Sequence, residues 1–447
     1  MQEMEGEYMG KRPLTDTINK ICIDTRKIEE NSLYIPIIGE NFDGHNFIDQ
    51  ALLSGAKISL SQRKDMNYKT NEIIIVDDTR QALLDLASYY RSLFSLATVG
   101  VTGSVGKTST KEMIYTILNA KAKTIKTLGN FNNEIGMPLT MFRLEKEYKY
   151  GVFEMGMSSF GEISKLSKVC RPNMSIITNI GVSHIENLKT QDNILKAKLE
   201  ILDGMESDAP LILNADDEYL KNVDTQTEHP VIYYAINNLS ADVRATNIKK
   251  ENMQTTFEIC YFGKTIKAQI PTVGIHNVMN ALAGFCVGLV AQINPQQIVD
   301  AMKWYKNDGM RQNFSNVDGI IVIKDCYNAS PDSMNSAIDT ITSIDCKGKR
   351  VCVFGDMLEL GDFSNEAHLE VGKNVARANI DLLICYGEKS SEIKRGAVMV
   401  GMKNVVYFTD KVLLKEYISE NLQKGDAIIY KASRGMKLEE IAITAEE

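Results

Sequence analysis

Residues 102–109, with the sequence T-G-S-V-G-K-T-S, are the segment whose residue types and spacing most clearly allow chemistry. A short β-rich run, Ala97–Val101, precedes this phosphate loop, and an apolar-periodic helix is predicted from about Lys107 to Leu118. Backbone N–H groups at such a helix start bind phosphate oxygens, and the helix dipole assists them. Lys107 can reach the β- and γ-phosphates of a nucleotide, and the hydroxyl of Thr108 can bind Mg²⁺. We therefore expect ATP contacts from Thr102, Gly103, Ser104, Val105, Gly106, Lys107, Thr108 and Ser109.

The spacing of this loop differs from the general phosphate loop. The general pattern has a glycine five residues before Gly106, where this chain has Val101, and the first glycine here is Gly103. An ordinary glycine-rich turn is the alternative interpretation. Because Gly106, Lys107 and Thr108 run directly into a helix, phosphate binding is the stronger one.

Two further residues with chemical potential follow strand-like runs. Glu154 ends the run Gly151–Glu154, and His184 comes shortly after Met174–Asn179. In an open parallel sheet, ligand-contacting residues gather at the carboxyl ends of the strands, and a carboxylate there can bind Mg²⁺. A solvated loop glutamate and a structural histidine are the alternatives.

Lys198 stands in an unusual place for a lysine. In the predicted helix Asp192–Met205, an apolar stripe contains Ile194 and Ile201, and Lys198 occupies a core-facing position of that stripe. Burial of an unpaired ammonium is costly and lowers the pKa of the amine. A neutral amine can react with CO₂ to give a carbamate, which binds hard cations through oxygen. The alternative is a lysine whose head group reaches water.

The elements that must position these residues fall into three segments, residues 1–96, 97–310 and 311–447. Strands alternate with helices in the second and third segments, which indicates parallel sheets covered on both faces. We expect an α/β protein with a small α/β N-terminal domain, a central parallel-sheet domain like a phosphate-loop ATPase, and a Rossmann-like, doubly wound C-terminal domain. Strands are predicted at 32–38, 72–76, 97–101, 151–154, 174–179, 211–213, 231–235, 320–324, 351–354, 382–386, 405–408 and 427–430.

Composition narrows the possible partners. A net charge of −8 argues against a general nucleic-acid binder. None of the eight cysteines forms a CxxC pair, the first 14 residues have no apolar core, and the longest apolar run, 281–291, is too short to span a bilayer. We expect a cytoplasmic monomer with no membrane span.

Four motifs together resemble the Mur ligase family. They are T-G-x-x-G-K-T-[ST] at 102–109, shared with folylpolyglutamate synthases, G-N-x-N-N-x-x-G at 129–136, A-K-x-E-I at 197–201 and H-N-x-x-N-A-L-A at 276–283. The resemblance runs along the whole chain. It implies an ATP-dependent ligase that forms an acyl phosphate, with Lys107, Glu154, His184 and Lys198 as catalytic residues. It also implies two Mg²⁺ ions at Thr108, Glu154, His184 and Lys198, the last as a carbamate.

The resemblance assigns further nucleotide contacts. Asn277 and Asn280 lie three residues apart on one helical face and suit an adenine edge. Arg311 resembles the arginine that contacts ATP phosphates when the domains close, although Met310 separates it from Gly309. Asp325, Tyr327 and Asn328 belong to an element that resembles D-x-Y-N-A-N-P-x-S-M, from which this chain departs at Ser330.

The same resemblance implies the other substrates. The element at 325–334 and the sequence G-D-M-L-E-L-G at 355–361 are similar to the branch that adds D-alanyl-D-alanine to a UDP-muramoyl tripeptide. Substrate contacts are implied for Thr25, Arg26, Asn41, Asp43, Gly44, His45, Asn132, Asn133, Lys431, Ser433 and Arg434. Rival interpretations are a neighbouring amino-acid-adding branch, whose D-N-P-R signature is absent, a folylpolyglutamate synthase, and a nucleotide-binding regulator without ligase activity.

Overall fold

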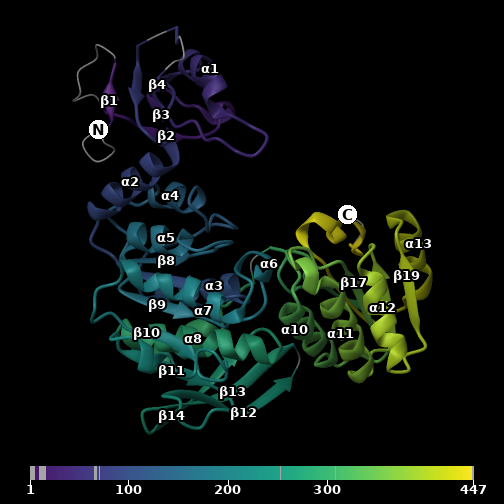
Figure 1. Ribbon diagram of the computed structural model, residues 1–447. Helices are drawn as coiled ribbons and strands as arrows, with labels where there is room; N and C mark the ends of the chain where they lie inside the picture. Colours follow the sequence, from purple (N-terminus) through teal and green to yellow (C-terminus); the bar gives the residue numbers. More distant parts are fainter. Residues whose placement is uncertain are drawn as a thin grey trace.

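The computed structural model describes residues 6–9, 17–64, 68–69, 71–251, 253–307 and 309–444. Three sheets, each with its own helices, follow one another along the chain (Figure 1). The first 14 residues, which lack the apolar core of an export signal, lie mostly outside the described residues. Among those described, no helix is both long and apolar enough to cross a membrane.

The N-terminal sheet has five strands in the order β1-β5-β4-β3-β2. Strand β1 runs antiparallel to β5, and the other neighbours are parallel. The side chain of Asp78 caps α2, which packs against α4 and α5 and so joins this sheet to the central domain (Figure 1). The elements are β1 (Glu7–Tyr8), β2 (Lys20–Cys22), β3 (Ser32–Tyr34), α1 (Ile48–Leu53), β4 (Ala56–Ser61), β5 (Ile73–Ile75) and α2 (Thr79–Ser92).

The central sheet has nine strands in the order β14-β13-β12-β11-β10-β9-β6-β8-β7. From β11 to β7 all neighbours are parallel, as the strand–helix alternation predicts. The strands are β6 (Ala97–Thr102), β7 (Thr124–Lys126), β8 (Tyr150–Glu154), β9 (Met174–Ile177), β10 (Leu211–Asn214), β11 (Val231–Ala235), β12 (Val243–Glu251), β13 (Gln254–Tyr261) and β14 (Lys264–Ile270). The helices are α3 (Lys107–Lys121), α4 (Gly136–Met141), α5 (Glu162–Cys170), α6 (Ile185–Leu188), α7 (Gln191–Leu199), α8 (Ile275–Val290) and α9 (Pro295–Met302).

The antiparallel edge formed by β12, β13 and β14 is an addition that the sequence analysis did not predict. Its β13–β14 turn has positive φ at both Phe262 and Gly263. Two such residues match the twist of a hairpin, but the first of them is usually Asn, Asp or Gly. A phenylalanine there hides the turn signal, so the expected all-parallel sheet was too simple.

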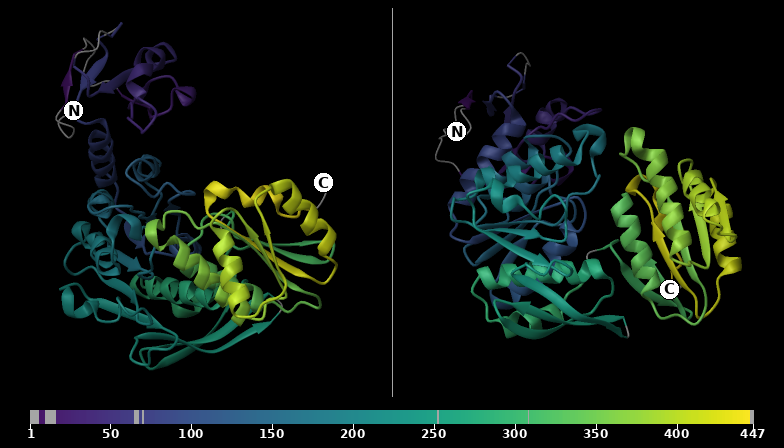
Figure 2. Two further views of the ribbon diagram at one scale, coloured as in Figure 1. Left: turned by 45° about the vertical axis from the view of Figure 1, so that its right-hand side comes forward. Right: turned by 60° about the horizontal axis from the view of Figure 1, so that its bottom comes forward.

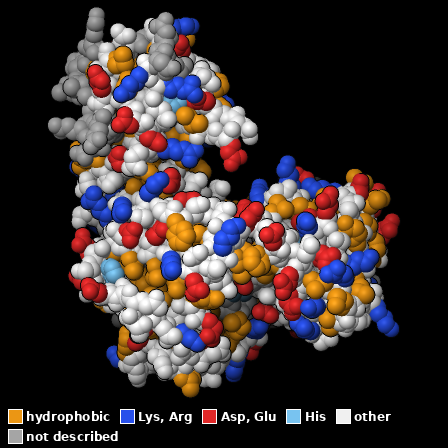
Figure 3. Space-filling view, in the orientation of Figure 1, with side chains coloured by type: hydrophobic (Ala, Val, Ile, Leu, Met, Phe, Trp, Pro, Cys, Tyr) orange, Lys and Arg blue, Asp and Glu red, His pale blue; other side chains and the backbone are white. Residues whose placement is uncertain are grey.

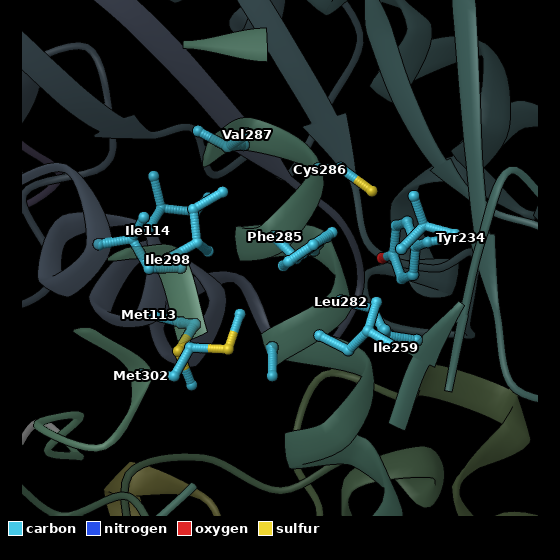
Figure 4. Close-up of a cluster of buried hydrophobic side chains, with 14 of the residues drawn as sticks. Met113, Ile114, Tyr234, Ile259, Leu282, Phe285, Cys286, Val287, Ile298 and Met302 are labelled. Atoms are coloured by element: carbon cyan, nitrogen blue, oxygen red, sulfur yellow. The ribbon is translucent and has the colours of Figure 1, made fainter. Parts of the chain in front are cut away.

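The main core of the central domain lies between α3, α8 and the sheet. Helix α8 is apolar on nearly all sides, as expected of a helix buried inside a domain. Phe285 is fully buried and meets Tyr261 edge-on, with ring centroids 5.1 Å apart. Met113 and Ile114 of α3 and Leu282 of α8 surround it (Figure 4).

The C-terminal sheet has six strands in the order β15-β16-β20-β17-β18-β19. Strand β15 is antiparallel to β16, and the rest are parallel. Cys352 and Phe354 of β17 face one core and Val351 and Val353 the other, so both faces are covered, as a doubly wound fold requires (Figure 2). The elements are β15 (Asn313–Val317), β16 (Ile320–Lys324), α10 (Pro331–Thr342), β17 (Arg350–Gly355), α11 (Ser364–Arg377), β18 (Leu382–Tyr386), α12 (Ser390–Met399), β19 (Val405–Phe408), α13 (Lys411–Asn421) and β20 (Ala427–Lys431).

All eight cysteines are free thiols. Six are buried within the domains, and Cys260 and Cys346 are partly exposed. The six buried cysteines thus act as small hydrophobic side chains, whereas Cys260 and Cys346 are partly open to solvent.

We predict that Phe285→Ala lowers the free energy of unfolding by about 3–5 kcal/mol, because it removes a buried ring and leaves a cavity. Urea unfolding followed by circular dichroism measures the change. Trp304→Ala is the control, since Trp304 is 78% exposed and its loss should change stability little. Equal effects of the two substitutions would contradict the assigned core.

Candidate active site

A cavity of about 770 Å³ lies between the central and C-terminal domains. On its outer face the molecule also has a notch between its N-terminal and C-terminal parts (Figure 3), and no described residue of the N-terminal domain lines the cavity itself. The central and C-terminal domains both contribute predicted residues to the cavity wall. These are Ser104, Val105, Gly106, Lys107, Ser109, Asn132, Asn133, Glu154, His184, Asn280, Arg311, Asp325, Tyr327, Asn328 and Lys431.

The phosphate loop is held against the end of strand β9. A Cβ added to Gly103 would lie 1.9 Å from Thr178 Oγ1, so only glycine fits there. The backbone N–H of Val105 donates to Asn179 Oδ1 at 2.9 Å, and Thr178 Oγ1 donates to the Val105 carbonyl at 2.6 Å. Gly106 has a φ of +84° and directly precedes α3, so the loop turns into the helix as the sequence predicted.

Lys107 extends back over this loop. Its ammonium donates to the Gly103 carbonyl at 2.7 Å and to the Ser104 carbonyl at 3.2 Å. Burial lowers the pKa of Lys107 to about 8, with Glu154 opposing the shift and Arg311 adding to it. Arg311, from the segment between the domains, lines the same cavity as Lys107 and the phosphate loop.

Glu154 is almost fully buried at the end of β8. Thr108 Oγ1 donates to its Oε2 at 2.8 Å, and Asn132 Nδ2 donates to its Oε1 at 2.8 Å. Lys111 Nζ lies 3.8 Å from Oε2 and 3.2 Å from Glu112 Oε1. The hydrogen bonds from Thr108 and Asn132 thus fix the orientation of the Glu154 carboxylate. The nearby Lys111 ammonium offsets its charge.

His184 and Lys198 are placed near each other and near Lys107. Burial lowers the pKa of His184 to about 4, with further lowering from the charges of Lys107 and Lys198. The imidazole is therefore neutral at neutral pH, and its 3.5 Å contact with Glu359 of the C-terminal domain is then not an ion pair. His184 also has a φ of +63°, which is unusual for a residue with a side chain.

Lys198 is 2% exposed, as its place in the apolar stripe predicts. Burial lowers its pKa well below the ordinary lysine value, and the charge of Lys107 adds to this. Within the described part of the chain, no acid lies within ion-pair distance of its ammonium. The amine is therefore set up to be neutral and to accept a group that carries negative charge.

The donor set at Thr108, Glu154 and His184 fits one type of metal site. No group of three or more His, Cys, Asp or Glu side chains in the described residues is placed to hold an ion alone. Mg²⁺ usually takes one or two protein oxygens and fills its remaining positions with water and phosphate oxygens. The buried carboxylate and the adjacent hydroxyl suit Mg²⁺ that arrives with a nucleotide.

The far wall of the cavity is formed by the hinge segment (residues 309–312) and the first loop of the C-terminal domain. The Arg311 guanidinium lies 4.0 Å from the centre of the Tyr327 ring, a cation–π contact that holds it above the cavity. Lys431 Nζ donates to Asp325 Oδ2 at 2.7 Å and to the Asn328 carbonyl at 3.0 Å. Lys431 therefore positions this loop through bonds within the protein.

Several predicted substrate residues lie away from the cavity or use their polar atoms internally. Ser433 Oγ accepts from the Leu358 N–H at 2.8 Å, and Arg434 pairs with Glu439 at 2.6 Å. Asn133 Oδ1 accepts two N–H groups of its own turn. The side chain of His45 is fully buried. The predicted residues of the N-terminal domain, Thr25, Arg26, Asn41, Asp43, Gly44 and His45, are not part of the cavity wall.

The N-terminal candidates form their own arrangement. Asp43 Oδ1 accepts from His45 Nδ1 at 2.7 Å, and its Oδ2 contacts Arg63. Arg26 is exposed and pairs with Asp24 through two hydrogen bonds. The guanidinium groups of Arg26 and Arg63 thus lie on this domain, and the role of Arg26 in binding a diphosphate stays a prediction.

Several polar residues of the site were not predicted from the sequence, among them Lys111, His276, Gln312 and Asp332. Lys111 stands three residues before Ile114, on the same helical face, so the argument applied to Lys198 would have found it. His276, Gln312 and Asp332 also line the cavity. Their partners are far away in the sequence, and no local spacing indicates them.

Comparisons with known proteins were made against this geometry. Three family models match in order: "Mur ligase family, catalytic domain" at residues 17–91, "Mur ligase middle domain" at 101–288 and "Mur ligase, glutamate ligase domain" at 310–434. The chain is 40% identical over 95% of its length to the UDP-N-acetylmuramoyl-tripeptide--D-alanyl-D-alanine ligase of Bacillus subtilis, and the alignment covers 92% of that protein. The chain belongs to the Mur ligase family.

Solved structures agree with this assignment. A crystal structure of MurF from Acinetobacter baumannii superimposes with a TM-score of 0.91 at 29% identity, covering 98% of this chain and 96% of that one. MurF ligase from Thermotoga maritima in complex with ADP gives a TM-score of 0.86 at 27% identity, covering 94% and 96%. The three-part α/β architecture of this Mur ligase is thus shared with these structures.

We predict that Asp332→Asn stabilises this Mur ligase near pH 8 by roughly 2 °C in melting temperature. Burial raises the pKa of Asp332, whose carboxylate accepts the Val182 N–H across the domain contact. A carboxyl group with a raised pKa contributes stability at low pH and loses it as pH rises through that pKa. An asparagine keeps an acceptor without the charge.

The measurement is thermal unfolding of both proteins from about pH 5 to pH 8. The advantage of the variant should shrink as pH falls and Asp332 takes up a proton. Glu416→Gln, at an exposed carboxyl on α13, is the matched control and should show no such trend. A variant that is less stable than the parent near pH 8 would contradict the prediction.

Proposed function

We propose that this chain is an ATP-dependent ligase that joins D-alanyl-D-alanine to UDP-N-acetylmuramoyl-tripeptide and so makes the pentapeptide precursor of peptidoglycan. The similarity of nearly the whole chain to ligases of that name carries the proposal. The cavity supports it, because a phosphate loop, a buried carboxylate and the hinge arginine meet there. We further propose that the enzyme acts in the cytoplasm, which its free thiols suit.

Each of the three segments has its own role in this proposal. Residues 1–96 hold the UDP-muramoyl peptide, residues 97–310 hold ATP, and residues 311–447 bring the amine and close the site. The cavity between the last two segments supports this division, since residues of both form its wall. The contact of α2 with α4 and α5 supports it for the first segment.

In the first step, a terminal carboxylate oxygen of the tripeptide attacks the γ-phosphorus of ATP. The new O–P bond forms as the bond to the β–γ bridging oxygen breaks, and ADP leaves with that electron pair. In this proposal the phosphate-loop N–H groups and Lys107 offset the charge on the transferring group. Arg311, above the cavity, adds a second cation from the side of the hinge.

In the second step, the amine of D-alanyl-D-alanine attacks the acyl carbon. The tetrahedral intermediate expels inorganic phosphate, the amine gives up a proton, and an amide bond remains. Water is the competing nucleophile. The C-terminal domain covers the cavity with its first loop and α10, which supports a role in excluding water.

Thr108, Glu154 and His184 are the residues that would hold Mg²⁺, which supplies charge neutralisation at the phosphates when it is bound. We propose that a second ion is bound with the help of a carbamate on Lys198. The neutral, buried and unpaired amine supports this modification. In forming it, the amine nitrogen bonds to the carbon of CO₂ and releases one proton.

The proposal predicts that phosphate release from ATP requires both UDP-muramoyl tripeptide and D-alanyl-D-alanine. We expect a pentapeptide product by mass spectrometry, and we expect Lys107→Met to lower kcat at least about 100-fold, because the transferring phosphoryl group loses a cation. Release with the tripeptide alone would indicate another amine donor and another branch. Release with no muramoyl peptide at all would favour a folylpolyglutamate synthase or a regulator and sink the proposal.

The carbamate proposal predicts a carbon signal from ¹³C-bicarbonate that is bound to the protein and absent in Lys198→Ala. We expect that variant to lose activity and to regain part of it with a short carboxylic acid, which replaces the missing carbamate oxygens. Lys196→Ala is the matched control, because Lys196 lies on the same helix and is exposed. A labelled signal that persists in Lys198→Ala would count against the assignment.

A further inference from the structure

A series of five buried polar side chains connects the phosphate-loop helix to the C-terminal domain. They are Thr110 on α3, Asn280 and Asn277 on α8, Gln312 in the hinge segment and Thr340 on α10. Each is less than 10% exposed. Burying a polar group lowers the stability of the fold unless the group is hydrogen-bonded. The hydrogen bonds of these five side chains therefore explain how they can be buried across two domains.

The hydrogen bonds in this series all run in one direction. Thr110 Oγ1 donates to Asn280 Oδ1 at 2.9 Å, and Asn280 Nδ2 donates to Asn277 Oδ1 at 3.4 Å. Asn277 Nδ2 donates to Gln312 Oε1 at 2.8 Å. Gln312 Nε2 donates to Thr340 Oγ1 at 3.0 Å, and that hydroxyl donates to the Ser336 carbonyl at 2.8 Å. Hydrogen bonds aligned in this way strengthen one another.

Gln312 is the member that joins the two domains. Its amide oxygen accepts from the central domain, and its amide nitrogen donates to the C-terminal domain and to His276 Nε2 at 2.6 Å. Burial lowers the pKa of His276, so the ring is neutral at neutral pH and that nitrogen can accept. All of the polar capacity of the Gln312 amide is therefore used, except for one lone pair on its oxygen.

The backbone at Gln312 is also unusual. Its φ is +45°, in the left-handed region that a residue with a side chain rarely adopts. Such strain persists where the surrounding contacts fix it, and the three side-chain bonds of Gln312 supply these contacts. The side chain is therefore held in place by its partners and not by local backbone preference.

This arrangement fixes the orientation of Asn280, which lines the cavity, through its hydrogen bond to the buried Asn277. Asn277 Nδ2 is directed at Gln312 and at the Val273 carbonyl, 2.7 Å away, so its Oδ1 points toward Asn280. An asparagine amide that is free to rotate presents either donor or acceptor, whereas this pair presents one fixed pattern. If α10 moved away, Gln312 would lose a partner inside a buried site, which disfavours the move.

We propose that Gln312 is a positioning residue that acts through Asn277 to fix Asn280 toward the nucleotide and ties both asparagines to helix α10, so that nucleotide affinity and placement of the C-terminal domain are coupled. The inference rests on the nucleotide site of the proposed function. It assigns to one hinge side chain the link between the two domains that form the cavity.

The first test is Gln312→Met, which keeps the length of the side chain and removes its polar atoms. We expect the Kd for ADP with Mg²⁺, measured by calorimetry, and the KM for ATP each to rise about tenfold, the loss of roughly one good hydrogen bond. The KM for UDP-muramoyl tripeptide should stay within about twofold of the parent value. Lys306→Met, at an exposed position near the hinge, is the control and should change neither constant.

The second test is Thr340→Val, which removes only the partner on the C-terminal domain. We expect ADP affinity to change by less than about threefold, whereas kcat/KM for D-alanyl-D-alanine falls about fivefold, the size of a modest coupling between sites. This variant also decides the matter if Gln312→Met does not fold. An unchanged kcat/KM for the dipeptide would then overturn the proposal.

Other outcomes are equally decisive. ADP affinity within twofold of the parent in a folded Gln312→Met protein would overturn the proposal, and so would a fall in kcat with every KM unchanged, which indicates general damage. ADP binding can be measured without turnover. If the parent chain binds ADP but forms no pentapeptide, the ligase proposal is contradicted and the proposal for Gln312 is not. Absence of ADP binding by the parent chain overturns both.

Discussion

The phosphate loop lies against the end of β9 at a distance that leaves no room for a side chain on Gly103. The side chains of Thr178 and Asn179 hold the loop there through hydrogen bonds with the backbone N–H and carbonyl of Val105. This contact sets where α3 begins, and hence where Thr108 and Lys111 meet Glu154 on the neighbouring strand. The other groups of the cavity are placed relative to this first turn of α3.

Positive charge gathers in a chain whose net charge is −8. The charge of Arg311 acts on Lys107 and that of Lys107 on Lys198, and burial holds the pKa of each of the two lysines below its ordinary value. Groups of this kind are stabilised by an anion that enters and pairs with them. The cavity is thus complementary to phosphate and carboxylate groups.

Local signals predicted a large part of this molecule, and long-range contacts account for what they missed. The five parallel strands of the C-terminal sheet were predicted almost to the residue, since each is a β-rich run between turns, whereas the antiparallel strand β15 was missed. Lys198 was predicted from its helical position, and its burial followed. By contrast, Gln312 acquires its role from Asn277, 35 residues away, and the Ser433 hydroxyl from Leu358, 75 residues away. The β13–β14 hairpin was missed because Phe262 occupies a turn position that usually holds a smaller residue.

The cysteines have a practical consequence for following domain closure. Cys260 on β13 and Cys346 just before β17 are the two partly exposed thiols, whereas the other six are buried. One reachable thiol therefore stands on each of the two domains that form the cavity. Fluorescent labels attached at these native positions would report the distance between the domains, with no cysteine added or removed. The protein thus already carries the attachment points for watching its own catalytic cycle one molecule at a time.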